Sequence, residues 1–158
     1  MSESNRELIH RLYVALDQRN GEAMAECYHP QATFRDPVFD LRGSEVGDMW
    51  RMLTSRATDL RAQASDIAAD ATTGSAHWVA HYTYSGTGRA VENRIDAKYR
   101  FTDGLIIDHV DSFDLWKWTR QALGPVGLLL GWTPFVQAKV RRQARAGLDR
   151  FIAERRKA

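Results

Sequence analysis

Residues 94–115 read RIDAKYRFTDGLIIDHVDSFDL, and this stretch decides the fold class. Over residues 94–101 apolar and charged residues alternate, as in a strand with one buried side and one side in water. Asp103-Gly104 is typical of a tight hairpin turn, and residues 105–115 continue as a second strand. The first strand is expected to bury Ile95, Ala97, Tyr99 and Phe101.

Further strands are predicted upstream of this hairpin. Residues 77–84 alternate in the same way and are rich in aromatic and β-branched side chains. The Ala-rich stretch 60–70 is expected to be a strand because the sheet needs a partner there. A short strand is also expected over residues 33–35, ahead of Asp36-Pro37.

Three helices are predicted before the sheet. The capping-box pair Ser4 and Glu7 begins the first, which runs to Asn20-Gly21. The second covers residues 22–28 and must end near Pro30. The third covers residues 44–56, with an apolar stripe formed by Val46, Met49, Trp50 and Leu53.

The chain returns to helices after the last strand. Gly124-Pro125 interrupts one helix, Gly131 ends a short apolar turn, and Thr133-Pro134 begins a final helix. Helices followed by antiparallel strands indicate an α+β fold rather than βαβ units. We expect residues 1–115 to form the main domain and residues 116–158 to form a helical extension packed on it.

Composition and length are those of one soluble domain. The chain has 158 residues, 44% hydrophobic and 27% charged, enough for one core and one ligand cavity. Its single cysteine, Cys27, cannot form an internal disulfide, and the N-terminus lacks a secretory pattern, so we expect a cytoplasmic protein. No apolar run approaches the roughly 20 residues that span a bilayer, so no membrane span is expected.

Charge is distributed unevenly along the chain. Residues 1–138 hold 14 basic and 18 acidic residues, whereas residues 139–158 hold 8 and 2. A basic last helix can bind nucleic acid or anionic lipid, but its charges surround an apolar stripe, which favours a solvated outer face. Nucleic acid is therefore not the expected partner.

The sequence lacks the motifs that are typical of several kinds of binding site and catalytic site. The chain has no phosphate-binding Gly-rich loop, no zinc-type Cys/His spacing and no nucleophile-elbow serine. His77 and His81 share a strand face but have no third ligand, and Cys27 on an apolar helix stripe is expected to be inert. We expect neither a metal nor a cofactor.

Two candidate catalytic residues lie on otherwise apolar elements near the N-terminus. Tyr13 is on the buried stripe of the first helix, so its hydroxyl must either bond a core partner or point into a cavity. Asp36 follows Phe34 by two residues and shares its apolar side. An Asp before Pro is also a common turn-former, so both interpretations remain open.

A second pair of candidates lies on the last strand. Alternation puts Ile107, His109, Asp111 and Phe113 on one face, and Ile106 on the other. A carboxylate beside an imidazole fixes its tautomer and raises its basicity, which suits a general acid or base. The alternative is a polar pair at the rim of the sheet.

The early part of the chain resembles the ketosteroid isomerases and the nuclear transport factor 2-like (SnoaL-like) superfamily. The resemblance rests on Leu12-Tyr13, Asn20-Gly21, the segment YHPQATFRDP at residues 28–37, and Arg42-Gly43. It implies a curved antiparallel sheet that forms a cone around an apolar pocket, closed by the early helices, and a homodimer through the outer face of the sheet.

The same resemblance implies catalytic roles. Tyr13 matches the oxyanion-stabilising tyrosine and Asp36 the proton-shuttling aspartate. If Phe101 keeps the family's place, Ala97 takes the position of the second acid of the isomerases and Asp96 points outward, unless a bulge turns Asp96 inward. His109 and Asp111 resemble the last-strand acid or His-carboxylate pair of related polyketide cyclases and dehydratases, so a strict steroid isomerase is not expected.

The leading hypothesis is a metal-independent enzyme that transfers protons on a small apolar carbonyl or hydroxyl compound. Asp36, His109 and Asp111 would move the protons, and Tyr13 would polarise the oxygen. A ligand-binding or accessory protein of the same fold is the alternative, and a scaffold with a basic docking helix is the third. The pocket walls are expected to be Trp50, Trp78, Tyr82, Tyr99 and Phe113.

Overall fold

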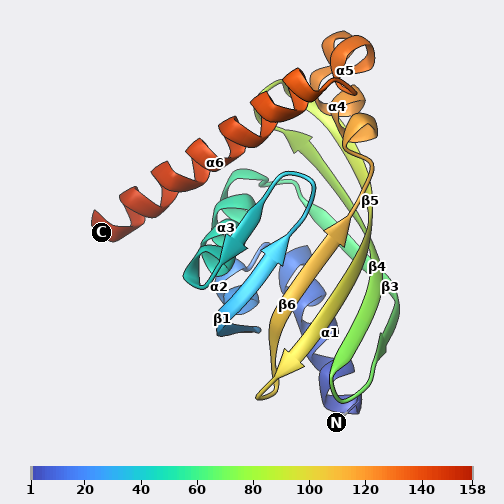
Figure 1. Ribbon diagram of the computed structural model, residues 1–158, viewed down its shortest axis with the longest axis vertical. Helices are drawn as coiled ribbons and strands as arrows, with labels where there is room; N and C mark the ends of the chain where they lie inside the picture. Colours follow the sequence, from blue (N-terminus) through green and yellow to red (C-terminus); the bar gives the residue numbers. More distant parts are fainter. Residues whose placement is uncertain (1, 158) are drawn as a thin grey trace.

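The computed structural model describes residues 2–157 and confirms an α+β fold. One six-stranded sheet has the strand order β2-β1-β6-β5-β4-β3. It curves around helices α1 and α3 without closing into a barrel (Figure 1). The strands are β1 Tyr28–Arg35, β2 Asp40–Arg42, β3 Arg61–Ala69, β4 Thr73–Tyr84, β5 Arg89–Thr102 and β6 Leu105–Ser112.

The long central strands follow the predicted alternation. In β5 every second residue from Val91 to Phe101 is buried and its neighbours are exposed. β4 and β3 pair antiparallel beside it, so the strand predicted for residues 60–70 is confirmed. Asp96 is exposed on the outer face, as expected, where it meets His77 of β4 at 2.9 Å.

One strand pair departs from the antiparallel sheet that we expected. β1 pairs with β6 in parallel, and β2, which was not predicted, pairs antiparallel with β1 at the edge. β1 begins at Tyr28 rather than at Thr33, and its register shifts between these two residues, around Pro30. Because proline has no N–H to donate, a strand tolerates it at such an irregularity.

The predicted alternation of β6 is wrong at its first half. Arg100 of β5 faces Asp108 and Phe101 faces Ile106, so Ile107 is an extra residue in β6. This bulge turns Ile106 onto the inner face, where it is fully buried, and leaves His109 and Asp111 on that same face.

The early helices match the prediction in number but not in all bounds. α1 Ser2–Asp17 begins before the predicted capping residue Ser4, which lies inside the helix. α2 Gly21–Ala25 is shorter than expected because Tyr28 belongs to β1. α3 Ser44–Arg56 has the predicted bounds, and it buries Val46, Met49 and Trp50.

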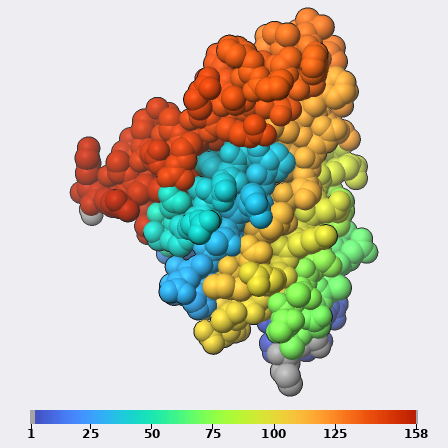
Figure 2. All heavy atoms as spheres, in the orientation of Figure 1, coloured from blue at the N-terminus to red at the C-terminus, as the bar shows by residue number. Residues whose placement is uncertain are grey.

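Three helices follow the sheet: α4 Leu115–Leu123, α5 Pro125–Leu130 and α6 Pro134–Lys157. α6 lies across α3 at one end of the molecule, and Leu148 is buried in the main core (Figures 1 and 2). Arg145 pairs with Glu45, and Arg155 meets Asp48 at 3.2 Å. The division at residue 115 stays a prediction, and its outer ends, Met1 and Ala158, lie outside the described residues.

Among residues 2–157, the structure contains no helix of the length and apolar character needed to cross a membrane.

Candidate functional site

A cavity of about 310 Å³ lies between the curved sheet, α3 and the C-terminal helices. That volume is at the lower end of the range of small-molecule sites. Most of the wall is apolar, and polar side chains interrupt it at a few points. The residues used below that line it are Asp36, Trp50, Trp78, Tyr82, Asn93, Asp111, Phe113 and Trp118.

Asp36 lies in the turn between β1 and β2, with its carboxylate on the cavity wall. Its Oδ1 atom accepts hydrogen bonds from the backbone N–H groups of Val38 (2.7 Å) and Phe39 (2.6 Å). Asp36 therefore shapes the turn with one oxygen while its side chain lines the cavity, and its catalytic role stays a prediction. The Oδ2 atom has no hydrogen-bond partner among the described residues.

Burial raises the pKa of Asp36 from 3.8 to about 6. The two backbone hydrogen bonds oppose this rise, and the negative charge of Asp111 adds to it. A carboxyl group with a pKa near 6 exchanges its proton readily at neutral pH, which is what a general acid or base requires.

Asp111 forms a buried pair with His109 on the inner face of β6. His109 Nε2 lies 2.8 Å from Asp111 Oδ1, and Trp78 Nε1 donates to the same oxygen at 3.4 Å. Asp111 Oδ2 has no partner among the described residues, and Asp111 lines the cavity whereas His109 lies behind it. The free oxygen is therefore the atom that this pair offers to a ligand.

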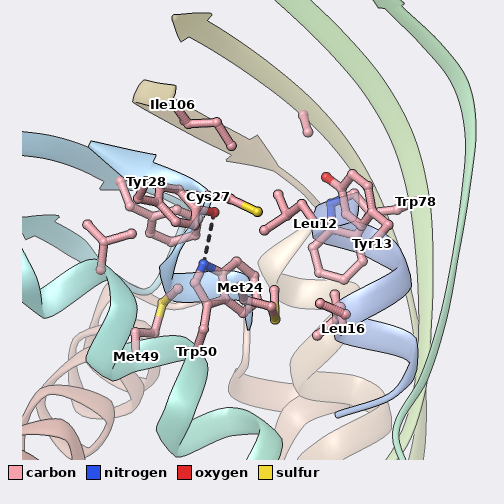
Figure 3. Packing of buried hydrophobic residues seen from close by; sticks show 14 of the residues in the cluster. Leu12, Tyr13, Leu16, Met24, Cys27, Tyr28, Met49, Trp50, Trp78 and Ile106 are labelled. Carbon is pink, nitrogen blue, oxygen red and sulfur yellow. Dashed lines mark hydrogen bonds between the residues drawn. The ribbon is translucent and has the colours of Figure 1, made fainter. Parts of the chain in front are cut away.

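A chain of hydrogen bonds continues from His109 into the core. Tyr28 Oη lies 2.8 Å from His109 Nδ1. The same oxygen accepts a bond from Trp50 Nε1 at 2.9 Å (Figure 3). Because Trp50 can only donate, the Tyr28 hydroxyl keeps its own proton for His109 Nδ1. If the Tyr28 hydroxyl donates to Nδ1, the imidazole proton lies on Nε2 and is directed at Asp111.

Tyr13 and Tyr99 are brought together, but not in the cavity. Both are buried, and their hydroxyl groups bond to each other. The Tyr13 ring packs beside that of Trp78, with ring centroids 5.5 Å apart (Figure 3). Burial raises the pKa of both hydroxyls well above their ordinary value. Neither tyrosine is among the described residues that line the cavity.

The other four predicted wall residues, Trp50, Trp78, Tyr82 and Phe113, do line the cavity. The Tyr82 hydroxyl accepts a hydrogen bond from Trp118 Nε1 at 2.7 Å, which leaves its own proton for a ligand. Burial raises the pKa of Tyr82 to about 12, so it remains a donor across the physiological range.

Sequence reasoning missed Asn93, Tyr84 and Trp118 as lining residues. The alternation of β5 carries the signal for Asn93, because it lies two residues before Ile95 on the buried face. Asn93 is buried on the cavity wall, and its carboxamide is a group that can donate to a ligand oxygen. Trp118 lies on α4, and no local pattern indicates that this helix meets the cavity.

Metal-ligating groups do not gather in the described part of the chain: no three His, Cys, Asp or Glu side chains lie together as a metal site. Cys27 is buried, and burial raises the pKa of its thiol, which makes it a poor nucleophile.

Comparison with known protein families shows the family to which the chain belongs. The SnoaL-like domain family matches residues 9–109, which covers α1 to the middle of β6 and includes Asp36 and His109. The chain belongs to the SnoaL-like family. No curated protein matches the sequence.

Solved structures share the fold at low identity. A ketosteroid isomerase-like protein from Catenulispora acidiphila, solved with trimethylamine, has a TM-score of 0.67 and 14% identity, covering 81% of this chain and 98% of its own. An LEH-like epoxide hydrolase from M. tuberculosis has a TM-score of 0.64 and 16% identity, covering 82% and 98%. IdmH from Streptomyces antibioticus, provisionally a polyketide cyclase, has a TM-score of 0.59 and 24% identity, covering 72% and 94%. These likenesses show the fold alone, and the chemistry must be argued from the site.

Proposed function

We propose that this SnoaL-like protein is an enzyme that transfers protons on a small apolar carbonyl or hydroxyl compound. One observation carries the proposal: Asp36 and Asp111 line the same apolar cavity. In each carboxylate the Oδ1 atom accepts hydrogen bonds from the protein, and the Oδ2 atom has no partner among the described residues. Two carboxylates in different environments suit the two halves of a proton transfer.

Asp36 is proposed as the group that removes and returns the proton. Its pKa of about 6 leaves it mostly ionised at pH 7, yet close enough to neutrality to release the proton again. The Val38 and Phe39 amides hold its Oδ1, which fixes the direction of Oδ2.

Asp111 is proposed as the second proton-transfer group, with His109 as its positioning residue. In this proposal His109 Nε2 donates to Asp111 Oδ1, and the Tyr28 hydroxyl favours that tautomer by donating to Nδ1. A single placed acid or base contributes about a hundred- to ten-thousand-fold in rate. Loss of either carboxylate should therefore be easy to detect.

The ligand oxygen needs a hydrogen-bond donor in the cavity. The family resemblance implies Tyr13 for this role, but the Tyr13 hydroxyl is bonded to Tyr99 away from the described lining. Tyr82 meets the requirement better, because it lines the cavity and retains a free proton. We therefore assign the polarising role to Tyr82, with Asn93 as a second donor, and keep Tyr13 as a support for Trp78.

The reaction class that fits this site is isomerisation, dehydration or cyclisation. All three proceed by removal of a proton and its delivery elsewhere, and the cavity supplies two acids at separate points. The names of the structural neighbours, among them a polyketide cyclase and an epoxide hydrolase, are compatible with acid–base chemistry in this fold.

The test measures proton removal without knowledge of the natural substrate. A panel of cyclic ketones is incubated with the protein in D₂O, and deuterium incorporation beside the carbonyl is followed by NMR. We expect exchange with the wild type, and a loss of at least a hundredfold in Asp36→Asn and in Asp111→Asn. Asp40→Asn, at an exposed position on β2, is the matched control and should exchange like the wild type.

A ligand-binding or accessory role is the second candidate, and the position of Tyr13 favours it. A pocket that lacks the expected oxyanion donor can still bind an apolar ligand. For a binding protein, Asp36→Asn would either change the affinity for a ketone or leave it unchanged. No ketone of the panel would incorporate deuterium with the wild type. For the enzyme, the same variant keeps ketone affinity within a few-fold while exchange is lost.

The homodimer implied by the resemblance is also part of the proposal. The outer sheet face that would form it carries polar contacts such as His77 with Asp96 and His81 with Glu92. Sedimentation of the wild type and of Arg94→Glu, at an exposed position on the same face, tests this arrangement. A monomer at micromolar concentration would exclude it.

A further inference from the structure

The segment from α5 to the start of α6 exposes a cluster of large apolar side chains. Of the eight large hydrophobic side chains that are exposed in the described residues, six fall between residues 126 and 135 and are 50 to 74% exposed. We call these six residues the apolar tip: Val126, Leu128, Leu129, Leu130, Trp132 and Phe135. The tip projects at one end of the molecule, far from the N-terminus (Figures 1 and 2).

We propose that the apolar tip docks on the surface of an anionic phospholipid bilayer. This inference is independent of the proton-transfer chemistry of the cavity. Tryptophan and leucine on a short projecting element, flanked by positive charge, are the side chains that enter the boundary between headgroups and acyl chains.

The charge around the tip complements an anionic surface. Residues 115–148 contain six basic residues and no acidic residue. Lys117 and Lys139, on the two helices that flank the tip, are exposed, and so is Arg142. Each basic residue near an anionic membrane surface adds to the attraction, within about a Debye length.

The backbone carbonyl groups of the tip are hydrogen-bonded within the protein, as a lipid environment requires. The last carbonyl groups of a helix have no partner within the helix and are normally bonded by water. In lipid they must be bonded by the protein itself. Here four successive carbonyls are bonded by nearby donors: Leu128 by Trp116 Nε1, Leu129 by Trp132 Nε1, Leu130 by the Thr133 amide, and Gly131 by Gln137 Nε2.

The same features argue against a second copy of the chain as the occupant. Two tips packed against each other would bring two sets of the exposed cations Lys117, Lys139 and Arg142 together, and residues 115–148 hold no acidic residue to offset them. A protein partner also tolerates carbonyls that bond across the interface or through water, so it does not call for complete bonding within the tip.

Vesicle co-sedimentation of the full chain tests the proposal. The vesicles contain equal parts phosphatidylserine and phosphatidylcholine, or phosphatidylcholine alone. The wild type should pellet with the anionic vesicles, bind the neutral ones much more weakly, and lose binding as salt rises. The double variant Leu129→Ser with Phe135→Ser should need at least tenfold more lipid, because it removes the two most exposed apolar side chains of the tip.

Two controls keep this test specific. Val14→Ser changes an exposed apolar residue (41%) on α1, away from the tip, and should bind lipid like the wild type. Lys139→Gln with Arg142→Gln should weaken binding to anionic vesicles several-fold and leave binding to neutral vesicles unchanged. Circular dichroism confirms that each variant folds, and quenching of tryptophan emission by brominated lipid reports insertion in the wild type directly.

Three results would overturn the proposal. One is a wild type that does not pellet with anionic vesicles at low salt. Another is a tip variant that pellets like the wild type. The third is a dimer that the tip substitutions separate into monomers while no form of the protein binds lipid, which would assign the tip to a second copy.

Discussion

His109 Nε2 and Asp111 Oδ1 lie 2.8 Å apart in the core, with side chains that are 1% and 3% exposed. The same sheet carries a second His–Asp pair at nearly the same distance, His77 with Asp96 at 2.9 Å, on its exposed outer face. Two pairs with similar contact distances in opposite surroundings allow the effect of burial to be measured in one protein.

The buried pair should be far more sensitive to loss of its histidine. We predict that His109→Leu lowers the free energy of unfolding by about 2–3 kcal/mol, because it removes a hydrogen-bond partner from the buried Asp111 side chain. His77→Leu should cost at most about 1 kcal/mol, because exposed pairs are screened by water. Urea unfolding of the two variants measures both values, and equal effects would contradict the role of burial.

The raised pKa of Asp36 makes the stability of the protein depend on pH. The native state holds the Asp36 proton more tightly than the unfolded chain, so this residue's contribution is fully present below about pH 4 and is lost as pH rises through about 6. A shift of roughly two pKa units corresponds to at most about 3 kcal/mol.

Asp36→Asn isolates that contribution. The asparagine keeps an oxygen for the Val38 and Phe39 amides but cannot ionise. We expect the variant to match the wild type at pH 4 and to be more stable by about 1–3 kcal/mol at pH 8. Thermal unfolding across this pH range gives the difference, and a constant offset between the two proteins would show that Asp36 has an ordinary pKa.

Tyr28 should act on the site through His109 rather than by contact with a ligand. Tyr28→Phe removes the donor to His109 Nδ1 and the acceptor for Trp50 Nε1, and we expect it to cost about 1–3 kcal/mol. The ¹⁵N shifts of the imidazole should then report a mixture of tautomers in place of the Nε2-protonated form. Tyr84→Phe, which changes an aromatic residue at the cavity wall, is the control and should leave those shifts unchanged.

The junction of α4 and α5 is packed too closely for a side chain at Gly127. A Cβ atom there would lie 1.9 Å from the backbone oxygen of Thr119. Gly127→Ala should therefore destabilise the protein by about 1–3 kcal/mol, since the backbone of α4 must move. Val126→Ala, one residue earlier and 56% exposed, should change the melting temperature little. Similar melting temperatures for both variants would show that the α4 backbone moves to admit the new Cβ atom at little cost in stability.

Local patterns in the sequence account for most of the elements. The stripe of Val46, Met49 and Trp50 defines α3, and the alternation around Ile95 and Tyr99 defines β5, because each pattern depends only on which side of one element is buried. The family resemblance supplied the curved sheet and the cavity that these elements form.

Features that depend on contacts between distant segments were not predictable in the same way. The extra residue Ile107 follows from how β6 pairs with β5, and the parallel pairing of β1 follows from the path of the chain around α3. Because Tyr28 was expected on a helix, its bond to His109 could not be foreseen, although His109 and Asp111 were correctly expected to share a face.

The position of Tyr13 illustrates the same limit at the level of single atoms. Its place on the buried stripe of α1 is a local property, and it is confirmed. Whether its hydroxyl meets a cavity or another side chain depends on Tyr99, which lies 86 residues later. Helical spacing carries no information on that contact.

The pH dependence of ketone exchange tests the central claim most directly, namely that Asp36 removes a proton from a ligand in the cavity. With a ketone that the wild type exchanges in D₂O, we predict a rate that rises with pH, reaches half of its plateau near pH 6, and is lost in Asp36→Asn. A rate that does not change between pH 5 and pH 8, or that survives in Asp36→Asn, would contradict the account.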